Sequence, residues 1–186
     1  MNTTSTPSED TIYLAGGCFW CTEAVFDRVR GVTDVESGYA NGHVDHPRYE
    51  QICEGNTGHA EVVRVRFDPA QVSLRALLEI FFATHDPSTL NRQGNDVGPQ
   101  YRSGIYTTHP EQAEVARAVM DELRAARGPG AAPIVTELLP LTGYWPAEAY
   151  HQDYFLKHPQ QGYCAFVVGP KVQKFQATFA QHLRQD

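Results

Sequence analysis

The residue of this sequence with the clearest chemical potential is Cys18, which follows two glycines and precedes two large aromatic residues, Phe19 and Trp20. The apolar run 11–15 before it is typical of a strand, and residues 22–29 after it are typical of a helix. Cys18 would then lie at a helix N-terminus, where free N–H groups lower the pKa of a thiol. The aromatic pair suggests a pocket wall for a small apolar group. A buried structural cysteine with aromatic core neighbours fits the same pattern, so both interpretations stay open from this segment alone.

A second candidate is the carboxyl group of Glu61, near the start of the segment 59–67. Alternation in this segment is typical of a strand, and it places Glu61 on the same face as Val63 and Val65. A carboxylate that points the way core residues point is costly unless it is protonated or hydrogen-bonded. We therefore expect either a partly buried acid whose pKa is raised by desolvation, or a frayed strand end with Glu61 in water.

Two phenols and another carboxylate extend this set. Tyr101 opens a predicted strand, while Tyr49 and Asp96 lie in two long connections, 39–58 and 86–100. Connections of this length inside a compact domain are usually functional. A nucleophilic sulfur, a protonated carboxyl and phenol donors suit attack on a polar atom whose oxygen must be protonated before it leaves.

The elements that must position these residues follow from hydrophobic periodicity. In chain order, the first two thirds read strand (11–15), helix (22–29), strand (31–38), strand (59–67), helix (74–82) and strand (101–107). This is the order of a ferredoxin-like split βαβ plait, a two-layer α/β sandwich of the α+β class. We expect extra C-terminal elements after it: a helix entered at 108–110 and stopped at Gly128, a strand at 134–139, a helix at 147–156, an extended segment at 164–168 and a last helix at 170–183.

Length and charge limit the classes of function. With 186 residues and a net charge of -7, the chain predicts a single catalytic domain, 11–186, after a disordered leader, 1–10. No basic run, secretory signal or membrane span is visible, so we expect no nucleic-acid partner, no membrane association and a cytoplasmic location. The four cysteines are too sparse for a disulfide scaffold. We also expect a monomer.

No cofactor or metal is expected. Four histidines could be imagined as ligands, but they have no ligand spacing that we recognise; they are His43, His46, His59 and His85.

Four segments together resemble the methionine sulfoxide reductase A family: Gly17-Cys18-Phe19-Trp20, Gly58-His59-Ala60-Glu61, Gly94-Asn95-Asp96 with Gln100-Tyr101-Arg102-Ser103, and Ala147-Glu148-Ala149-Tyr150-His151-Gln152. The resemblance runs in order from Thr11 to Phe175. It implies a ferredoxin-like α/β plait and reduction of methionine-S-sulfoxide, free or in oxidised proteins.

The resemblance also implies roles for individual residues. Cys18 matches the nucleophile and Glu61 the acid. The remaining matches are Phe19 and Trp20 for the wall that holds the substrate methyl group, Tyr49 and Tyr101 for the phenols that bind the sulfoxide oxygen, and Asp96 for a further polar residue of the site.

The chemistry implied is attack of the Cys18 thiolate on the sulfoxide sulfur, which leaves methionine and a Cys18 sulfenic acid. A second cysteine then forms a disulfide with Cys18, and a thioredoxin-type donor reduces it. We favour Cys21 as this resolving cysteine because adjacent thiols need little loop closure, with Cys164 next.

Magnitudes indicate which group matters most besides the nucleophile. Lowering a thiol pKa from ~8.5 to ~6.5 raises the thiolate fraction at pH 7 by roughly 25-fold. The accompanying loss of nucleophilicity leaves a net gain of only about threefold. General acid catalysis contributes ~10²–10⁴-fold. We therefore expect Glu61, rather than thiol acidity, to dominate the chemical step.

Three other functions stay open on the residues alone. The first is a thiol hydrolase or acyltransferase in which a histidine such as His59 activates Cys18. The second is a thioredoxin-like oxidoreductase that uses Cys18 and Cys21, although the intervening Phe-Trp argues against it. The third is a binding module whose cysteines are core residues.

Overall fold

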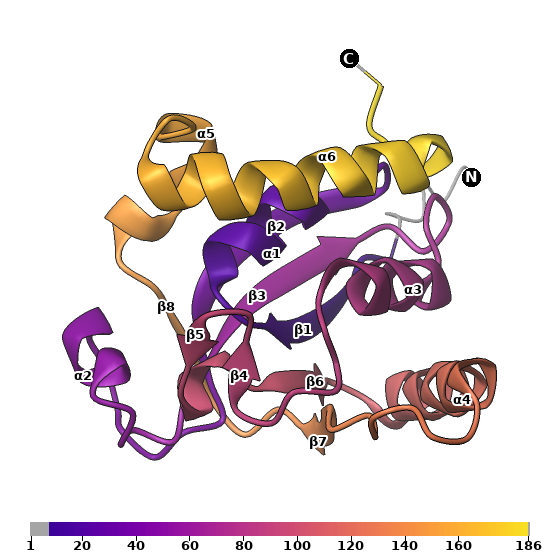
Figure 1. The fold of residues 1–186 in the computed structure, drawn as a ribbon, viewed down its shortest axis with the longest axis horizontal. Coiled ribbons are helices and arrows are strands. Elements are labelled where there is room, and N and C mark those ends of the chain that lie inside the picture. The colour runs from indigo at the N-terminus through magenta and orange to yellow at the C-terminus, as the bar shows by residue number, and fades with distance from the viewer. Residues whose placement is uncertain (1–7, 186) are drawn as a thin grey trace, which may run out of the picture.

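The centre of the molecule is a six-stranded sheet with the strand order β7-β6-β1-β3-β2-β8, accompanied by a two-stranded hairpin of β4 and β5 (Figure 1). This computed structural model describes residues 8–185, so residues 1–7 of the predicted leader lie outside the described part. The strands are β1 (Asp10–Gly16), β2 (Val32–Ala40), β3 (Ala60–Phe67), β4 (Arg92–Gln93), β5 (Asp96–Val97), β6 (Ser103–Thr107), β7 (Glu137–Pro140) and β8 (Tyr144–Pro146). Every neighbouring pair in the sheet is antiparallel except β6 and β7. The fold is therefore mixed α+β, as predicted.

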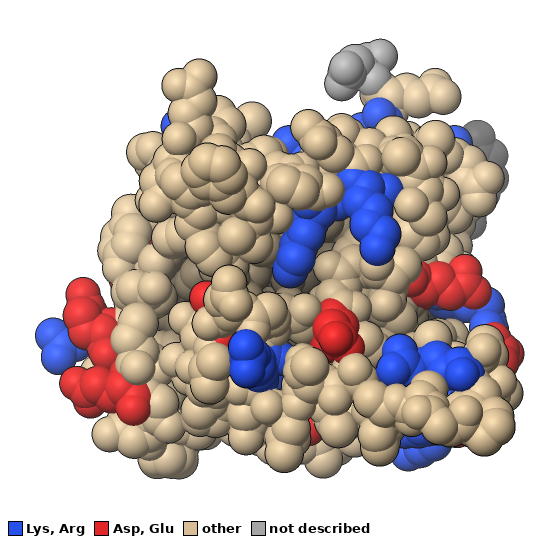
Figure 2. Space-filling model, viewed as in Figure 1, with Lys and Arg blue, Asp and Glu red and all other residues tan. Residues whose placement is uncertain are grey.

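Helices cover one face of this sheet, and α6 lies across α1 and α3 (Figure 1). The helices are α1 (Phe19–Phe26), α2 (Tyr49–Cys53), α3 (Leu74–Thr84), α4 (Pro110–Arg127), α5 (Tyr154–Lys157) and α6 (Gly169–Thr178). A hollow bordered by charged side chains is visible under α6 in Figure 2. Among the described residues, no helix has the length and apolar character needed to cross a bilayer.

The alternation of the strands explains how the sheet has two different faces. Leu14 of β1 and Val63 of β3 point into the main core with the helices, whereas Tyr13 and Val62 belong to a smaller cluster on the opposite face. Because successive strand residues point to opposite sides, Glu61 lies on the face of Val63, toward the helices. This placement agrees with the predicted parity.

The predicted helix at 74–82 is confirmed as α3. The Ser73 hydroxyl accepts a hydrogen bond from the Ala76 N–H at 3.0 Å, which satisfies one free donor of the first turn. Leu77, Leu78 and Phe81 are fully buried on the face that packs against the core.

The predictions for the C-terminal third are wrong in two places. Residues 164–168 are not extended but form a π-helical stretch that runs into α6. Only Cys164 and Val168 are buried within it, and this spacing of four is helical rather than strand-like. The predicted helix at 147–156 is reduced to a short turn, Ala149–His151, and to α5, because Asp153 between them has a left-handed backbone with φ 55°.

Smaller corrections concern the ends and connections of elements. Asp10 belongs to β1, paired with Phe67, so the last residue of the predicted leader is ordered. Helix α2 and strand β8 were not predicted. The last helix ends at Thr178 rather than at Leu183, and a separate turn follows at Ala180–His182.

Candidate active site

Cys18 lies in the turn between β1 and α1, at the N-cap position of the helix. Gly17 before it has φ 90°, in the left-handed region that glycine tolerates. A Cβ atom on Gly17 would lie 2.6 Å from the side chain of Gln93, so this side chain packs directly on the turn. The Cys18 residue itself is partly exposed.

Glu61 is buried beside this turn, with 2% of its surface exposed. Its Oε1 accepts a hydrogen bond from the Phe19 N–H at 3.1 Å, which links β3 to the first turn of α1. Burial raises the pKa of Glu61 to about 8, and the negative charge of Asp96 adds to the increase. The carboxyl is therefore about nine-tenths protonated at pH 7.

The thiol of Cys18 does not have the lowered pKa that its helix position predicts. Burial raises the pKa of Cys18 well above the ordinary value, and the carboxylate charge of Glu61 raises it further. A hydrogen bond from the Trp20 backbone N–H lowers the pKa, as expected at a helix N-terminus, but this effect is the smaller one. Desolvation therefore outweighs the helix N-terminus.

The two aromatic residues after Cys18 have different environments. Phe19 is 1% exposed and packs against His151, with ring centroids 5.1 Å apart. Trp20 is half-buried, stacks on Tyr154 at 3.8 Å, and donates a hydrogen bond from Nε1 to Nδ1 of His151 at 3.1 Å. Trp20 is thus the more accessible of the two rings and is fixed by stacking and a hydrogen bond, whereas Phe19 is part of the core.

His151 is a site residue for which sequence reasoning assigned no role, although its segment was noted. Burial lowers its pKa, so the imidazole is neutral, with Nδ1 accepting from Trp20. Its Nε2 is buried and makes no hydrogen bond to the described residues. The ring of Tyr49 lies 4.5 Å from the His151 ring, so this histidine connects Trp20 to a predicted site phenol.

Tyr49 and Tyr101 are both half-buried near the carboxyl of Glu61. Burial raises the pKa of each phenol, and the charge of Glu61 contributes to both increases. Both phenols therefore remain protonated donors at neutral pH. The sequence predicted that Tyr101 opens a strand. It instead ends the short turn Pro99–Tyr101, which precedes β6.

Asp96 lies in β5 and is connected to a further phenol that the sequence did not indicate. The Tyr163 hydroxyl donates to Oδ2 of Asp96 at 2.6 Å, and the same hydroxyl lies 3.9 Å from Sγ of Cys21. Burial raises the pKa of Tyr163, and negative charge on Cys18 adds to this effect. The one feature of the sequence that could have pointed to Tyr163 is its position next to Cys164, a candidate resolving cysteine.

The two candidate resolving cysteines are both buried free thiols. The Cys21 N–H donates to the Cys18 carbonyl at 3.1 Å, so these residues share the first turn of α1. Burial raises the pKa of Cys21 and that of Cys164. The structure thus places Cys21 within one helical turn of Cys18, and Cys164 in the main core.

The histidine considered as an activating base is held elsewhere. His59 accepts the Gly42 N–H at Nδ1 and contacts the Val44 carbonyl through Nε2 at 2.7 Å. Both ring nitrogens are therefore engaged by loop backbone. Within residues 8–185, no group of three or more histidines, cysteines and acidic residues is arranged to hold a metal ion.

Comparison with known proteins gives the family. The family model described as peptide methionine sulfoxide reductase matches residues 10–183. Peptide methionine sulfoxide reductase MsrA of Ralstonia nicotianae is 57% identical over 179 residues, which cover 94% of this chain and 93% of the relative.

Solved structures agree. Reduced Mxr1 from Saccharomyces cerevisiae is 36% identical and superposes with a TM-score of 0.77, covering 86% of this chain and 91% of that chain. Mxr1 in complex with Trx2 is matched with a TM-score of 0.54 at 26% identity, over 82% of this chain and 91% of that chain. This chain belongs to the peptide methionine sulfoxide reductase family.

Proposed function

We propose that this protein reduces methionine-S-sulfoxide, free or within oxidised proteins, with Cys18 as the nucleophile and Glu61 as the proton donor. One observation carries the proposal: a buried carboxyl with a pKa of about 8 is hydrogen-bonded to the backbone N–H of the residue after Cys18. When the substrate is a methionine sulfoxide within a protein, the reaction restores the methionine and so repairs a protein damaged by oxidative stress.

The first half-reaction transfers one oxygen atom. Sγ of Cys18 attacks the sulfoxide sulfur, while Glu61, Tyr49 and Tyr101 protonate the sulfoxide oxygen. The attack forms a bond between Sγ and the substrate sulfur. The protonated oxygen then moves to Sγ as both its bond to the substrate sulfur and the new sulfur–sulfur bond break, so that methionine leaves and Cys18 becomes a sulfenic acid. The sulfur of Cys18 is oxidised by two electrons and the substrate sulfur is reduced by two. Trp20 and Phe19 hold the substrate methyl group, and Asp96 with Tyr163 closes the polar side.

The raised pKa of Cys18 fits this scheme. A protonated Glu61 is neutral, so it does not repel the developing thiolate as a carboxylate would. Low pH therefore supplies the acid and high pH supplies the thiolate, and the two requirements oppose each other. General acid assistance of ~10²–10⁴-fold outweighs the small benefit of a more acidic thiol.

The second half-reaction forms a disulfide. A thiol attacks the sulfenic acid of Cys18, water leaves, and a thioredoxin-type donor reduces the resulting bond. The proximity of Cys21 within one helical turn supports it as the resolving thiol, with Cys164 as the alternative. Mass spectrometry after one turnover distinguishes them, because the variant lacking the resolving thiol, Cys21→Ser or Cys164→Ser, accumulates sulfenic acid without a disulfide.

The reductant is inferred from a relative. Mxr1 of Saccharomyces cerevisiae has been crystallised in complex with Trx2, which supports a thioredoxin-type donor for this chain. The enzyme is then cytoplasmic, because its thiols must be reduced after each turnover and the cytosol keeps thiols reduced. It acts as a monomer and without cofactors.

We further propose that residues 11–186 form one catalytic domain built on a ferredoxin-like plait. The strand order β6-β1-β3-β2 supports this. Numbered along the chain as strands of the plait, these are the fourth, first, third and second strands. The outer strands β7 and β8 are then additions at the two edges.

The central experiment supplies methionine-S-sulfoxide and dithiothreitol and measures methionine by chromatography. Wild type should produce methionine and Cys18→Ser should produce none, whereas Cys53→Ser, at an exposed cysteine of α2, should remain within a few-fold of wild type. Turnover by Cys18→Ser would refute the proposal. A hydrolase that depended on His59 would instead lose activity in His59→Ala and accumulate an acyl-enzyme.

A further inference from the structure

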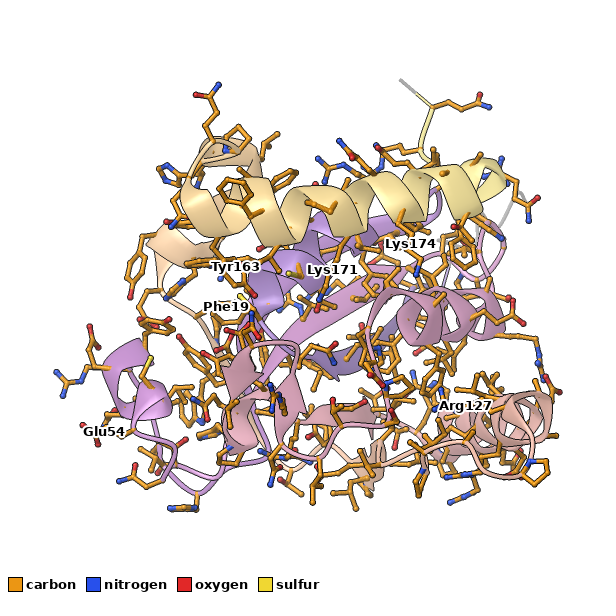
Figure 3. All side chains as sticks on the ribbon, viewed as in Figure 1. Phe19, Glu54, Arg127, Tyr163, Lys171 and Lys174 are labelled. Carbon is orange, nitrogen blue, oxygen red and sulfur yellow. The ribbon has the colours of Figure 1, made fainter. Side chains whose placement is uncertain are left out.

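A cavity whose lining does not include Cys18 lies between α3, α6 and the end of α4. We call it the basic groove; it encloses about 580 Å³ and is lined by three cations, Lys171 and Lys174 of α6 and Arg127 of α4. Figure 3 shows these residues on the two sides of the hollow that is visible in Figure 2. Two of the three lysines of the chain are therefore placed at this one cavity.

Among the described residues, the cations of the basic groove form no close ion pair, although the charge of Arg127 contributes to lowering the pKa of Asp86. Within residues 8–185, none of the three has a carboxylate oxygen within 4.0 Å. Nη2 of Arg127 donates to the Ala132 carbonyl at 3.1 Å, but its buried Nε has no partner. This arrangement leaves positive charge available to a ligand.

One acidic residue, Asp86, also lines the groove. Its carboxylate accepts hydrogen bonds from the backbone N–H and hydroxyl of Ser88, and these bonds hold its pKa below the ordinary value. His85 also lines the groove, and desolvation lowers its pKa to about 4, so it adds no charge at neutral pH. The groove therefore carries net positive charge in a protein whose net charge is -7.

The basic groove adjoins the nucleophile turn. Gln93 lines the groove, packs on Gly17 next to Cys18, and is fixed by two hydrogen bonds to the backbone of Asp86 at 2.9 and 3.0 Å. Lys171 is also close enough to Cys21 to lower the pKa of that thiol. The groove therefore lies on the Gln93 side of the turn that holds Cys18, within reach of a polypeptide whose oxidised methionine is bound at Cys18.

We propose that the basic groove binds carboxylate side chains that flank the methionine sulfoxide of a protein substrate, so that acidic segments are preferred. The inference rests on the proposed function and adds a substrate class to it. The volume suits a few residues rather than one ion. Each exposed carboxylate–ammonium pair contributes up to about fivefold in affinity, and salt screens it.

The test compares three peptides that differ only in the residues flanking the sulfoxide: glutamates, glutamines or lysines. With dithiothreitol as reductant at low salt, we expect kcat/KM to be about tenfold higher for the glutamate than for the lysine peptide, approaching equality above about 0.5 M salt. The double variant Lys174→Glu/Arg127→Glu should reverse the preference. Arg117→Glu, at an exposed position of α4 outside the groove, should preserve it.

Two further measurements separate the possible failures. Free methionine-S-sulfoxide should be reduced equally by wild type and the double variant; no reduction by either would refute the proposed function itself. Peptide binding to Cys18→Ser by fluorescence anisotropy then still reports on the groove. Equal affinity for the glutamate and lysine peptides would overturn the inference. So would a double variant whose activity is impaired only when a thioredoxin replaces dithiothreitol, because the groove would then bind the reductant rather than the substrate.

Discussion

Two buried glutamates, one within α1 and one beside its first turn, differ in which groups hydrogen-bond to their carboxyl oxygens. Glu23, within the helix, accepts hydrogen bonds on both oxygens, from the Ser37 hydroxyl at 2.8 Å and from the Asp153 N–H at 2.7 Å. Glu61, beside the start of the helix, accepts one, from the Phe19 N–H, and its second oxygen receives none from the described residues. Burial raises the pKa of both, to about 7 for Glu23 and about 8 for Glu61.

The comparison teaches that a shifted pKa alone does not identify a catalytic acid. Glu23 joins α1 to β2 and to the segment before α5, so its carboxyl is occupied by structural partners. Glu61 has one oxygen without a hydrogen bond from the described residues, and its carboxyl lies beside the turn that holds Cys18, where its proton is available to a ligand. Geometry, rather than titration, separates the two roles.

The largest expected effect is on the chemical step. Glu61→Gln preserves shape and the hydrogen bond from Phe19 but removes the acidic proton. We expect the single-turnover rate of sulfoxide reduction to fall by ~10²–10⁴-fold, with substrate affinity nearly unchanged. Rapid-quench measurement of methionine tests this, with Glu23→Gln as the matched control, which should lose only a few-fold. Comparable losses in both variants would break the distinction.

A smaller but shared effect concerns stability against pH. Both glutamates bind a proton more tightly in the folded than in the unfolded chain, so their contribution is fully present below about pH 4.5. It is lost as the pH rises through about 7 and 8, the two folded values. Relative to Glu23→Gln/Glu61→Gln, wild type should lose on the order of 3 kcal/mol of unfolding free energy between about pH 6 and pH 7.5.

Denaturant titrations at each pH give this difference. A wild type that gained stability over the same range relative to the double variant would show that the sign of the two shifts is wrong. The activity profile should respond to one residue only: the loss of rate above about pH 8 depends on Glu61.

Removing the structural carboxyl altogether should cost stability but not chemistry. Glu23→Ala leaves the Asp153 N–H and the Ser37 hydroxyl without their partner, and we expect a loss of about 2 kcal/mol of unfolding free energy. The folded variant should retain the single-turnover rate. Urea denaturation and quench measurements on the same preparation check both, and a rate loss near that of Glu61→Gln would assign Glu23 to the reaction.

The smallest effect is expected from Ser37→Ala. It removes one donor from Glu23 and should raise the pKa of this carboxyl further, because hydrogen bonds to the charged form are lost. Unfolding free energy should fall by about 1 kcal/mol. Carbon-detected NMR titration of the glutamate carboxyls measures the shift, and an unchanged pKa would remove Ser37 from the comparison.

Local patterns predicted the elements that carry the site, because the strand, glycine turn and helix around Cys18 and the alternation of β3 depend on neighbours in the chain. The pKa of Cys18 was predicted with the wrong direction, since the helix N-terminus is a local feature whereas burial and the charge of Glu61 are tertiary ones. The bond between Tyr163 and Asp96 joins distant segments, and no period in the sequence encodes it. At residues 164–168, apolar composition concealed a helical spacing of buried positions.

The absence of a side chain at Gly17 allows the hairpin of β4 and β5 to pack closely against the turn that holds Cys18. Gln93 occupies the volume that any larger residue at 17 would claim. The added methyl group of Gly17→Ala would therefore displace Gln93 and, with it, the hairpin that carries Asp96. The substitution would disturb the position of Asp96 relative to Cys18 without removing any of the proposed reacting groups.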